Sequence, residues 1–127
     1  MLDFLHLILL GSFKQAAEFT KFKTSIRIEM GKFQEIIKAE IPTLVDFYAT
    51  WCGPCRTMQP VLDQLKHEMG NEVRILKIDV DKNTEIADKF KIRGVPTFIL
   101  FKSGEIQWRT SGGMDIKTLK SKIKSAI

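Results

Sequence analysis

A near-continuous run of apolar residues at positions 43–49 (TLVDFYA) constrains the fold of this chain more than any other feature. A strand that is apolar at consecutive positions is typical of a sheet covered on both faces, because an exposed face would carry alternating polar residues. A helical pattern over residues 56–69 follows almost at once and ends at Gly70. A buried strand that leads into an amphipathic helix predicts an α/β fold.

From about residue 24, strand and helix patterns alternate, and we expect a central mixed sheet of four to five strands with helices on both faces. The last two strands are separated only by residues 102–105, so they must form an antiparallel hairpin. Ile26 and Ile28 are the candidates for the fifth strand, which would come first. The other predicted elements are a helix around residues 33–37, a strand at 73–80, a helix at 84–90 capped by Asn83, hairpin strands at 97–101 and 106–110, and a C-terminal helix at 116–127.

The cysteines lie where the first buried strand meets the long helix. The chain of 127 residues contains only Cys52 and Cys55, too few for a disulfide scaffold. A cysteine at a helix N-terminus has its thiolate stabilised by free backbone N–H groups and by the helix dipole, which makes Cys52 the expected nucleophile. Cys55, one turn further on, is placed to resolve a mixed disulfide. Gly53 would allow a tight loop, and Pro54 suits a first helical turn.

Two other classes of function fit the sequence less well. A zinc site needs about four ligands, and the only further soft candidates are His6 and His67, which form no paired motif, so we expect no metal. Twenty Lys and Arg against fifteen Asp and Glu give a net charge of +5, an excess too small and too dispersed to predict nucleic-acid binding.

Two motifs resemble landmarks of the thioredoxin family. They are FYATWCGPC at residues 47–55 and RGVPT at residues 93–97, and the similarity extends over residues 30–127. Tyr48 stands where many members have Trp. The resemblance implies the thioredoxin fold and a thiol–disulfide oxidoreductase that reduces protein disulfides by dithiol–disulfide exchange. It also implies disulfide-containing protein substrates, no bound cofactor, and electrons supplied by a thioredoxin reductase that uses NADPH. We expect a monomer.

Asp46 is an acidic residue in an otherwise apolar strand. An unpaired buried carboxylate is costly, so Asp46 is either a structural residue satisfied by hydrogen bonds or a carboxyl with a raised pKa. In the second case it could accept the Cys55 proton through water. The resemblance favours the second interpretation, because Asp46 falls on the family's buried acid. The resemblance also matches Lys77 to the lysine near that acid, which implies that Lys77 adjusts the pKa of Asp46. Alternatively, Lys77 is a strand lysine with its ammonium in solvent.

The second motif contains Pro96. Judged from the residues alone, a trans peptide bond is the safer expectation, since cis costs about 0.5–1 kcal/mol more before proline. The resemblance implies a cis Val95–Pro96 bond against the cysteine pair, with the Val95 backbone free to pair with an extended substrate segment. Gly112 and Gly113 could be only a turn into the last helix. The resemblance implies instead that they join a flat, mostly apolar docking surface made of Trp51, Gly53, Pro54, Val95, Pro96, Gly112 and Gly113.

Residues 1–29 are interpreted as an N-terminal extension and residues 30–127 as the thioredoxin domain. Ten positions without Lys, Arg, Asp or Glu lie between Asp3 and Lys14, too few to span a membrane. No basic residue precedes them, which favours a helical extension and a cytoplasmic protein over export by a signal peptide within residues 1–17. Met30 resembles a native start, which suggests that residues 1–29 are read from an upstream start codon. The alternatives to a cytoplasmic reductase are an exported or membrane-tethered relative, or a non-catalytic binding subunit.

Overall fold

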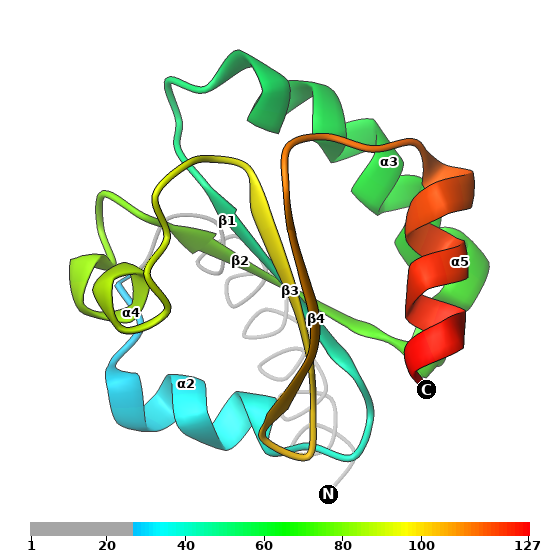
Figure 1. Cartoon of the computed structure of the whole chain (residues 1–127), viewed down its shortest axis with the longest axis horizontal. Helices are drawn as coiled ribbons and strands as arrows, with labels where there is room; N and C mark the ends of the chain where they lie inside the picture. Colours follow the sequence, from blue (N-terminus) through cyan, green and yellow to red (C-terminus); the bar gives the residue numbers. More distant parts are fainter. Residues whose placement is uncertain (1–26) are drawn as a thin grey trace, which may run out of the picture.

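Four strands form one mixed sheet in the order β2-β1-β3-β4 within residues 27–127, the part of the chain that the computed structural model describes (Figure 1). β1 runs parallel to β2 and antiparallel to β3, and β3 pairs with β4 in the predicted hairpin. Ile28 does not form a strand, and Ile26 lies outside the described residues. The strands are β1 (Thr43–Tyr48), β2 (Arg74–Asp79), β3 (Thr97–Lys102) and β4 (Glu105–Ser111).

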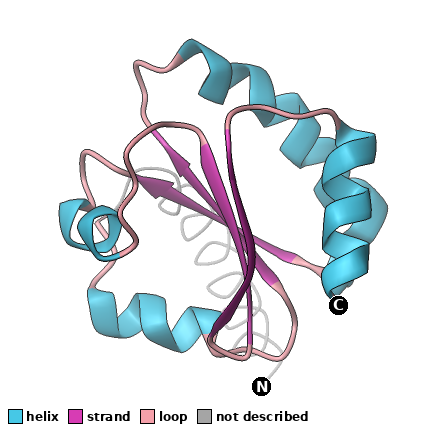
Figure 2. Cartoon of the chain, viewed as in Figure 1, coloured by secondary structure: helices cyan, strands magenta, loops and turns pink. Residues whose placement is uncertain are grey.

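Helices cover both faces of this sheet, as predicted (Figure 2). α3 (Gly53–Met69) and α5 (Ile116–Ala126) lie on one face. α2 (Met30–Ile37) and α4 (Thr84–Lys89) lie on the other. A short 3₁₀ turn, η1 (Gly70–Glu72), leads from α3 into β2. None of the described helices is both long and apolar enough to cross a membrane.

The alternation of side chains along β1 divides the core into two layers. Leu44 packs with residues of α3 and α5, whereas Val45 and Phe47 pack with residues of α2 and α4. Every residue of β1 is buried, because both faces of this central strand are covered. On the α2 side, Phe33 meets Phe101 edge-on, with 6.0 Å between ring centroids. This rigid centre places the carboxyl end of β1 and the start of α3 in a defined position.

The boundaries of α3 follow from local sequence chemistry. The helix starts at Gly53, three residues before the predicted helical pattern of residues 56–69, and Pro54 occupies its first turn, where a missing N–H costs nothing. It continues through Pro60 and ends at Gly70, whose φ of 54° is a conformation that favours glycine. The long helix can therefore present its N-terminus to the end of β1.

Asn83 is the N-cap residue of α4, as predicted, but it does not cap the helix through its side chain. Instead, the Asn83 amide accepts a hydrogen bond from the Ile28 backbone N–H at 2.6 Å and donates one to the Asp79 carbonyl at 3.0 Å. Ile28 also packs against the α2 and α4 core layer. Asn83 is thus used to attach the chain before α2 to the end of β2, a long-range contact that the local sequence does not indicate.

Candidate active site

The two cysteines lie at the carboxyl end of β1 and form a disulfide, with their Cα atoms 5.3 Å apart. Cys52 is the N-cap residue of α3, and its Sγ accepts a hydrogen bond from the Cys55 backbone N–H at 3.2 Å. Both cysteines are buried in a small cluster with Tyr48 and Ala49, beside Val80 and Val95. The free N–H groups and the positive end of the helix dipole therefore face the sulfur of Cys52, as the sequence predicted.

Gly53 has no conformational need to be glycine in this structure. A Cβ added there would meet no other atom within 4 Å, and its φ is not in the left-handed range. The turn before α3 therefore does not depend on glycine at this position. A side chain at this position would project from the start of α3 toward open space, next to the cysteines.

Asp46 is fully buried in the middle of β1, and neither of its carboxylate oxygens has a hydrogen-bond partner among the described residues. Burial raises the pKa of Asp46 from 3.8 to about 7, and the positive charge of Lys77 opposes this rise only in part. No residue in the described part of the chain supplies the hydrogen bonds that a purely structural aspartate would need. Asp46 lies on the same face of β1 as Leu44, which is the face covered by α3.

Lys77 is the direct neighbour of Asp46 across the parallel β1–β2 pair. Its half-buried position lowers the pKa of its ammonium, while the negative charges of Asp46 and Asp63 raise it. Lys77 is therefore a half-buried lysine whose charge interacts with that of Asp46. The residues matched by family resemblance come together here because adjacent strands place them in register.

The loop before β3 reaches the cysteine pair from another part of the sequence. The Val95–Pro96 peptide bond is cis, as the resemblance implied. The carbonyl oxygen of Val95 lies 3.7 Å from Sγ of Cys52. The Gly112 backbone N–H donates to the Pro96 carbonyl at 2.8 Å, and Gly112 has a φ of 88°, which favours glycine. Gly112 thus belongs to the site, since it ties the end of β4 to this loop.

Trp51 projects from the surface beside the cysteines, and 67% of the residue is exposed. Its indole Nε1–H donates to the carboxylate of Asp81 at 2.9 Å. The sequence reasoning missed Asp81 as a partner of Trp51, because the two residues are thirty positions apart and only the parallel β1–β2 pair brings their loops together. The sequence feature that could have predicted this contact is that Trp51 and Asp81 each follow one of two adjacent parallel strands.

An open apolar groove of about 620 Å³ continues from the cysteine loop along α3. Pro54, between the two cysteines, lines it together with Met58 and Met114. The Met114 backbone N–H contacts Sδ of Met58 at 3.4 Å. A Cβ on Gly113 would lie 3.5 Å from the same sulfur, an ordinary van der Waals distance, so the packing of this loop against α3 does not depend on glycine.

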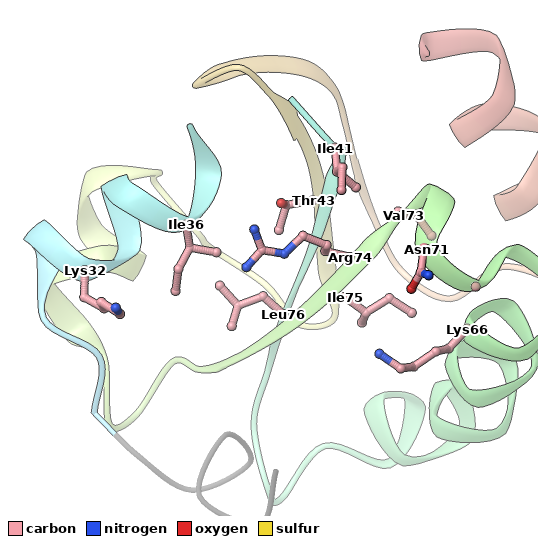
Figure 3. A pocket seen from close by; sticks show the side chains of 11 residues that line it. Lys32, Ile36, Ile41, Thr43, Lys66, Asn71, Val73, Arg74, Ile75 and Leu76 are labelled. Atoms are coloured by element: carbon pink, nitrogen blue, oxygen red, sulfur yellow. The ribbon is translucent and has the colours of Figure 1, made fainter. Parts of the chain in front are cut away.

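A second pocket, of about 430 Å³, opens at the other end of the sheet (Figure 3). Thr43 at the start of β1 lines it, together with the cationic side chains of Lys66 and Arg74. The cysteines follow the opposite end of β1, so this pocket takes no part in their chemistry.

Comparison with known proteins identifies the family. A sequence profile described as thioredoxin matches residues 24–125, most of the chain. The chain belongs to the thioredoxin family. A chloroplastic thioredoxin Y from Oryza sativa subsp. japonica is 36% identical over 126 residues, which cover 94% of this chain and 75% of that protein. A thioredoxin from Porphyra purpurea is 42% identical over 94 residues, covering 74% of this chain and 88% of the relative.

Solved thioredoxin structures share the fold. One from Trypanosoma brucei brucei has a TM-score of 0.72 and 28% identity, covering 82% of this chain and 91% of that one. A mutant thioredoxin from Halobacterium salinarum has a TM-score of 0.71 and 35% identity, covering 80% and 87%. Together with a cysteine pair at disulfide distance, these similarities make the chain a thiol–disulfide oxidoreductase. Among residues 27–127, no three His, Cys, Asp or Glu side chains are grouped as a metal site would require.

Proposed function

We propose that this thioredoxin-family chain works as a reductant of protein disulfides, with Cys52 as the nucleophile and Cys55 as the resolving cysteine. The observation that carries the proposal is the position of Cys52 as N-cap of α3, where its Sγ accepts the Cys55 backbone N–H at 3.2 Å. This hydrogen bond and the helix dipole stabilise a thiolate on Cys52 in the reduced protein. The resolving sulfur is one helical turn away and equally buried.

In the first step, the Cys52 thiolate attacks one sulfur of a substrate disulfide. A bond forms between Cys52 Sγ and that sulfur, the substrate S–S bond breaks, and the second substrate sulfur leaves as a thiolate. In the second step, the Cys55 thiolate attacks Cys52 Sγ, which forms the Cys52–Cys55 disulfide and releases the first substrate sulfur. The two substrate thiolates take up the two protons of the dithiol, so the substrate gains two electrons and two protons.

Asp46 would accept the Cys55 proton through water in the second step. A base works best when its pKa is close to the working pH, and burial raises the pKa of Asp46 to about 7. The lack of any hydrogen-bond partner among the described residues leaves both carboxylate oxygens free for a water molecule. Lys77 would limit how far the pKa of Asp46 rises, because its positive charge favours the ionised carboxylate.

The substrate would dock against the surface around the cysteines. Trp51 would provide an exposed apolar platform, and Gly53 and Pro54 are exposed next to Cys52. The backbone of Val95 would pair with an extended substrate segment, a mode of binding that tolerates many sequences. A backbone hydrogen bond of 2.8 Å joins Gly112 to Pro96 and fixes their relative position at the edge of this surface.

The chain would act as a monomer and receive its electrons from a thioredoxin reductase that uses NADPH, with no cofactor bound to the chain itself. The cytoplasm is the predicted compartment, with export as the alternative. The chain spans 54% of the length of a chloroplastic thioredoxin Y1 from Arabidopsis thaliana, to which it is 41% identical. Mass spectrometry of the mature N-terminus tests the compartment, because cleavage near Ala17 would favour export.

The assignment of the two cysteines is tested by single substitutions. With dithiothreitol as electron donor, Cys52→Ser should abolish turnover of insulin disulfides. Cys55→Ser should accumulate a mixed disulfide between Cys52 and the substrate, visible by non-reducing electrophoresis and mass spectrometry. Ser125, an exposed serine of α5 far along the chain, offers a control, since Ser125→Ala should leave turnover unchanged. Full turnover by the Cys52→Ser protein would refute the mechanism.

A further inference from the structure

Residues 90–96 connect α4 to β3 (Figure 1). This segment includes Val95, whose carbonyl oxygen lies near Cys52, and Pro96. Its first residues are held by Arg109, which lies on β4 and is remote from the cysteines in sequence. One guanidinium nitrogen, Nη1, donates to the Phe90 carbonyl, and Nη2 donates to the Lys91 carbonyl at 2.9 Å. One planar guanidinium group therefore donates hydrogen bonds to two consecutive carbonyl groups at the start of the segment.

These two carbonyl groups lie where the chain leaves α4. A helix leaves its last carbonyl groups without intrahelical partners, and its C-terminus favours a positive charge. Lys91 follows with a φ of 52°, an unusual conformation for a residue with a side chain. The fork of Arg109 fits this geometry because its two donors are fixed in one plane. It stabilises the turn that directs the chain away from α4 and toward the cysteines.

The same end of β4 also holds the far end of the segment. The Ser111 hydroxyl oxygen lies 3.2 Å from the Thr97 hydroxyl oxygen. The Thr97 hydroxyl in turn donates to the Gly94 carbonyl at 2.6 Å. One residue later, the Gly112 N–H donates to the Pro96 carbonyl at 2.8 Å. The segment is thus attached to one strand at both ends, and Arg109 supplies the attachment furthest from the cysteines.

We propose that Arg109 is a positioning residue that holds the Val95 backbone in place for pairing with an extended protein substrate. This inference rests on the proposed function, in which Val95 contacts the substrate. Arg109 does not touch the reacting sulfurs; it acts through the Phe90 and Lys91 carbonyl groups. A disulfide that lacks a peptide backbone has no use for this pairing. Loss of Arg109 should therefore impair the reduction of protein disulfides but not that of small disulfides.

The test compares two substrates in Arg109→Ala, Arg109→Lys and the unaltered full-length chain. The protein substrate is insulin, with dithiothreitol as electron donor, and the small substrate is hydroxyethyl disulfide. Arg74→Ala is the matched control, because it removes an equal charge from an exposed residue at the start of β2, which lies at the end of the sheet opposite the cysteines. Thermal midpoints are recorded for every protein.

Arg109→Ala should raise the KM for insulin by roughly fivefold to tenfold, which corresponds to about 1–1.4 kcal/mol, while kcat and the reduction of hydroxyethyl disulfide stay within about twofold. Arg109→Lys keeps the charge but can reach only one carbonyl group, so its KM should be intermediate. An unchanged KM for insulin, or an equal loss with both substrates, would overturn the inference. If Arg109→Ala fails to fold, the same comparison with Arg109→Lys decides. Failure of the unaltered chain to reduce insulin would instead refute the proposed function.

Discussion

Replacing Asp46 with asparagine should stabilise the protein at neutral and alkaline pH. Asp46 is fully buried, and its two carboxylate oxygens have no hydrogen-bond partner within the described residues. Ionisation there is costly because water no longer solvates the charge. Asparagine has nearly the same shape and stays neutral at every pH, so Asp46→Asn removes the charge without creating a cavity.

The magnitude follows from linkage between protonation and folding. The pKa of Asp46 is about 7 in the folded protein against 3.8 for an unperturbed aspartate, a difference that corresponds to about 4 kcal/mol. Because the folded pKa is the higher one, the unfolded chain releases the proton first as pH rises. Stability is therefore lost from about pH 4 upward, and the loss is complete above about pH 7. Well below the unperturbed pKa of 3.8, Asp46 is protonated in both states, and its ionisation no longer affects stability.

Denaturant unfolding of the oxidised protein, measured at several pH values, tests this reasoning. Asp46→Asn should exceed the unaltered protein by on the order of 4 kcal/mol at pH 8 and by nearly nothing at pH 4. Asp88 is exposed, and the control Asp88→Asn should change the free energy of unfolding by less than about 0.5 kcal/mol at either pH. A difference for Asp46→Asn that is the same at pH 4 and pH 8, or a loss of stability at pH 8, would show that burial of the charge is not the cause.

Three further predictions concern the surroundings of the cysteines. Gly112→Ala should destabilise the protein by about 1–2 kcal/mol in denaturant unfolding because its φ is 88°, whereas Gly53→Ala should be nearly neutral, and equal effects would contradict this. Lys77→Met should raise the pKa of Asp46 above about 7, measured by NMR titration of its carboxyl carbon; an unchanged or lower midpoint would mean that Lys77 does not act on it. Met114→Asp should raise the KM for insulin, since it places a charge in the apolar groove, and an unaffected KM would remove that groove from the docking surface.

Local patterns were sufficient to predict most of the secondary structure. The apolar run at residues 43–49 predicted a strand covered on both faces, and β1 is buried at every position. The positive φ values of Ser103 and Gly104 explain why residues 102–105 form a tight hairpin turn. The prediction for Asn83 is only partly correct. Its position before α4 is that of a cap, but a partner 55 residues away, the backbone of Ile28, competes successfully for its side chain.

Some features of the candidate active site could likewise be predicted from the local sequence, and others could not. The spacing of Cys52 and Cys55 at a strand–helix junction indicated redox chemistry without any structure, because the free N–H groups of a helix N-terminus are a local property. The buried environment of Asp46 could be predicted from its neighbours in the strand, but the direct pairing with Lys77 depends on the register of β1 and β2. The contact between Trp51 and Asp81 could not be predicted from residue types at all.

The sequence by itself therefore determined the chemistry of this protein and the order of its elements, since both depend on residues close together in the chain. The tertiary structure alone decided what surrounds that chemistry. It brings the Val95 carbonyl to within 3.7 Å of Cys52 and leaves Asp46 without hydrogen-bond partners in the described residues. It also places Arg109 of β4 on the carbonyl groups that precede Val95. These contacts depend on strand register and on loops that meet across the sheet, and short-range sequence patterns carry no information about either.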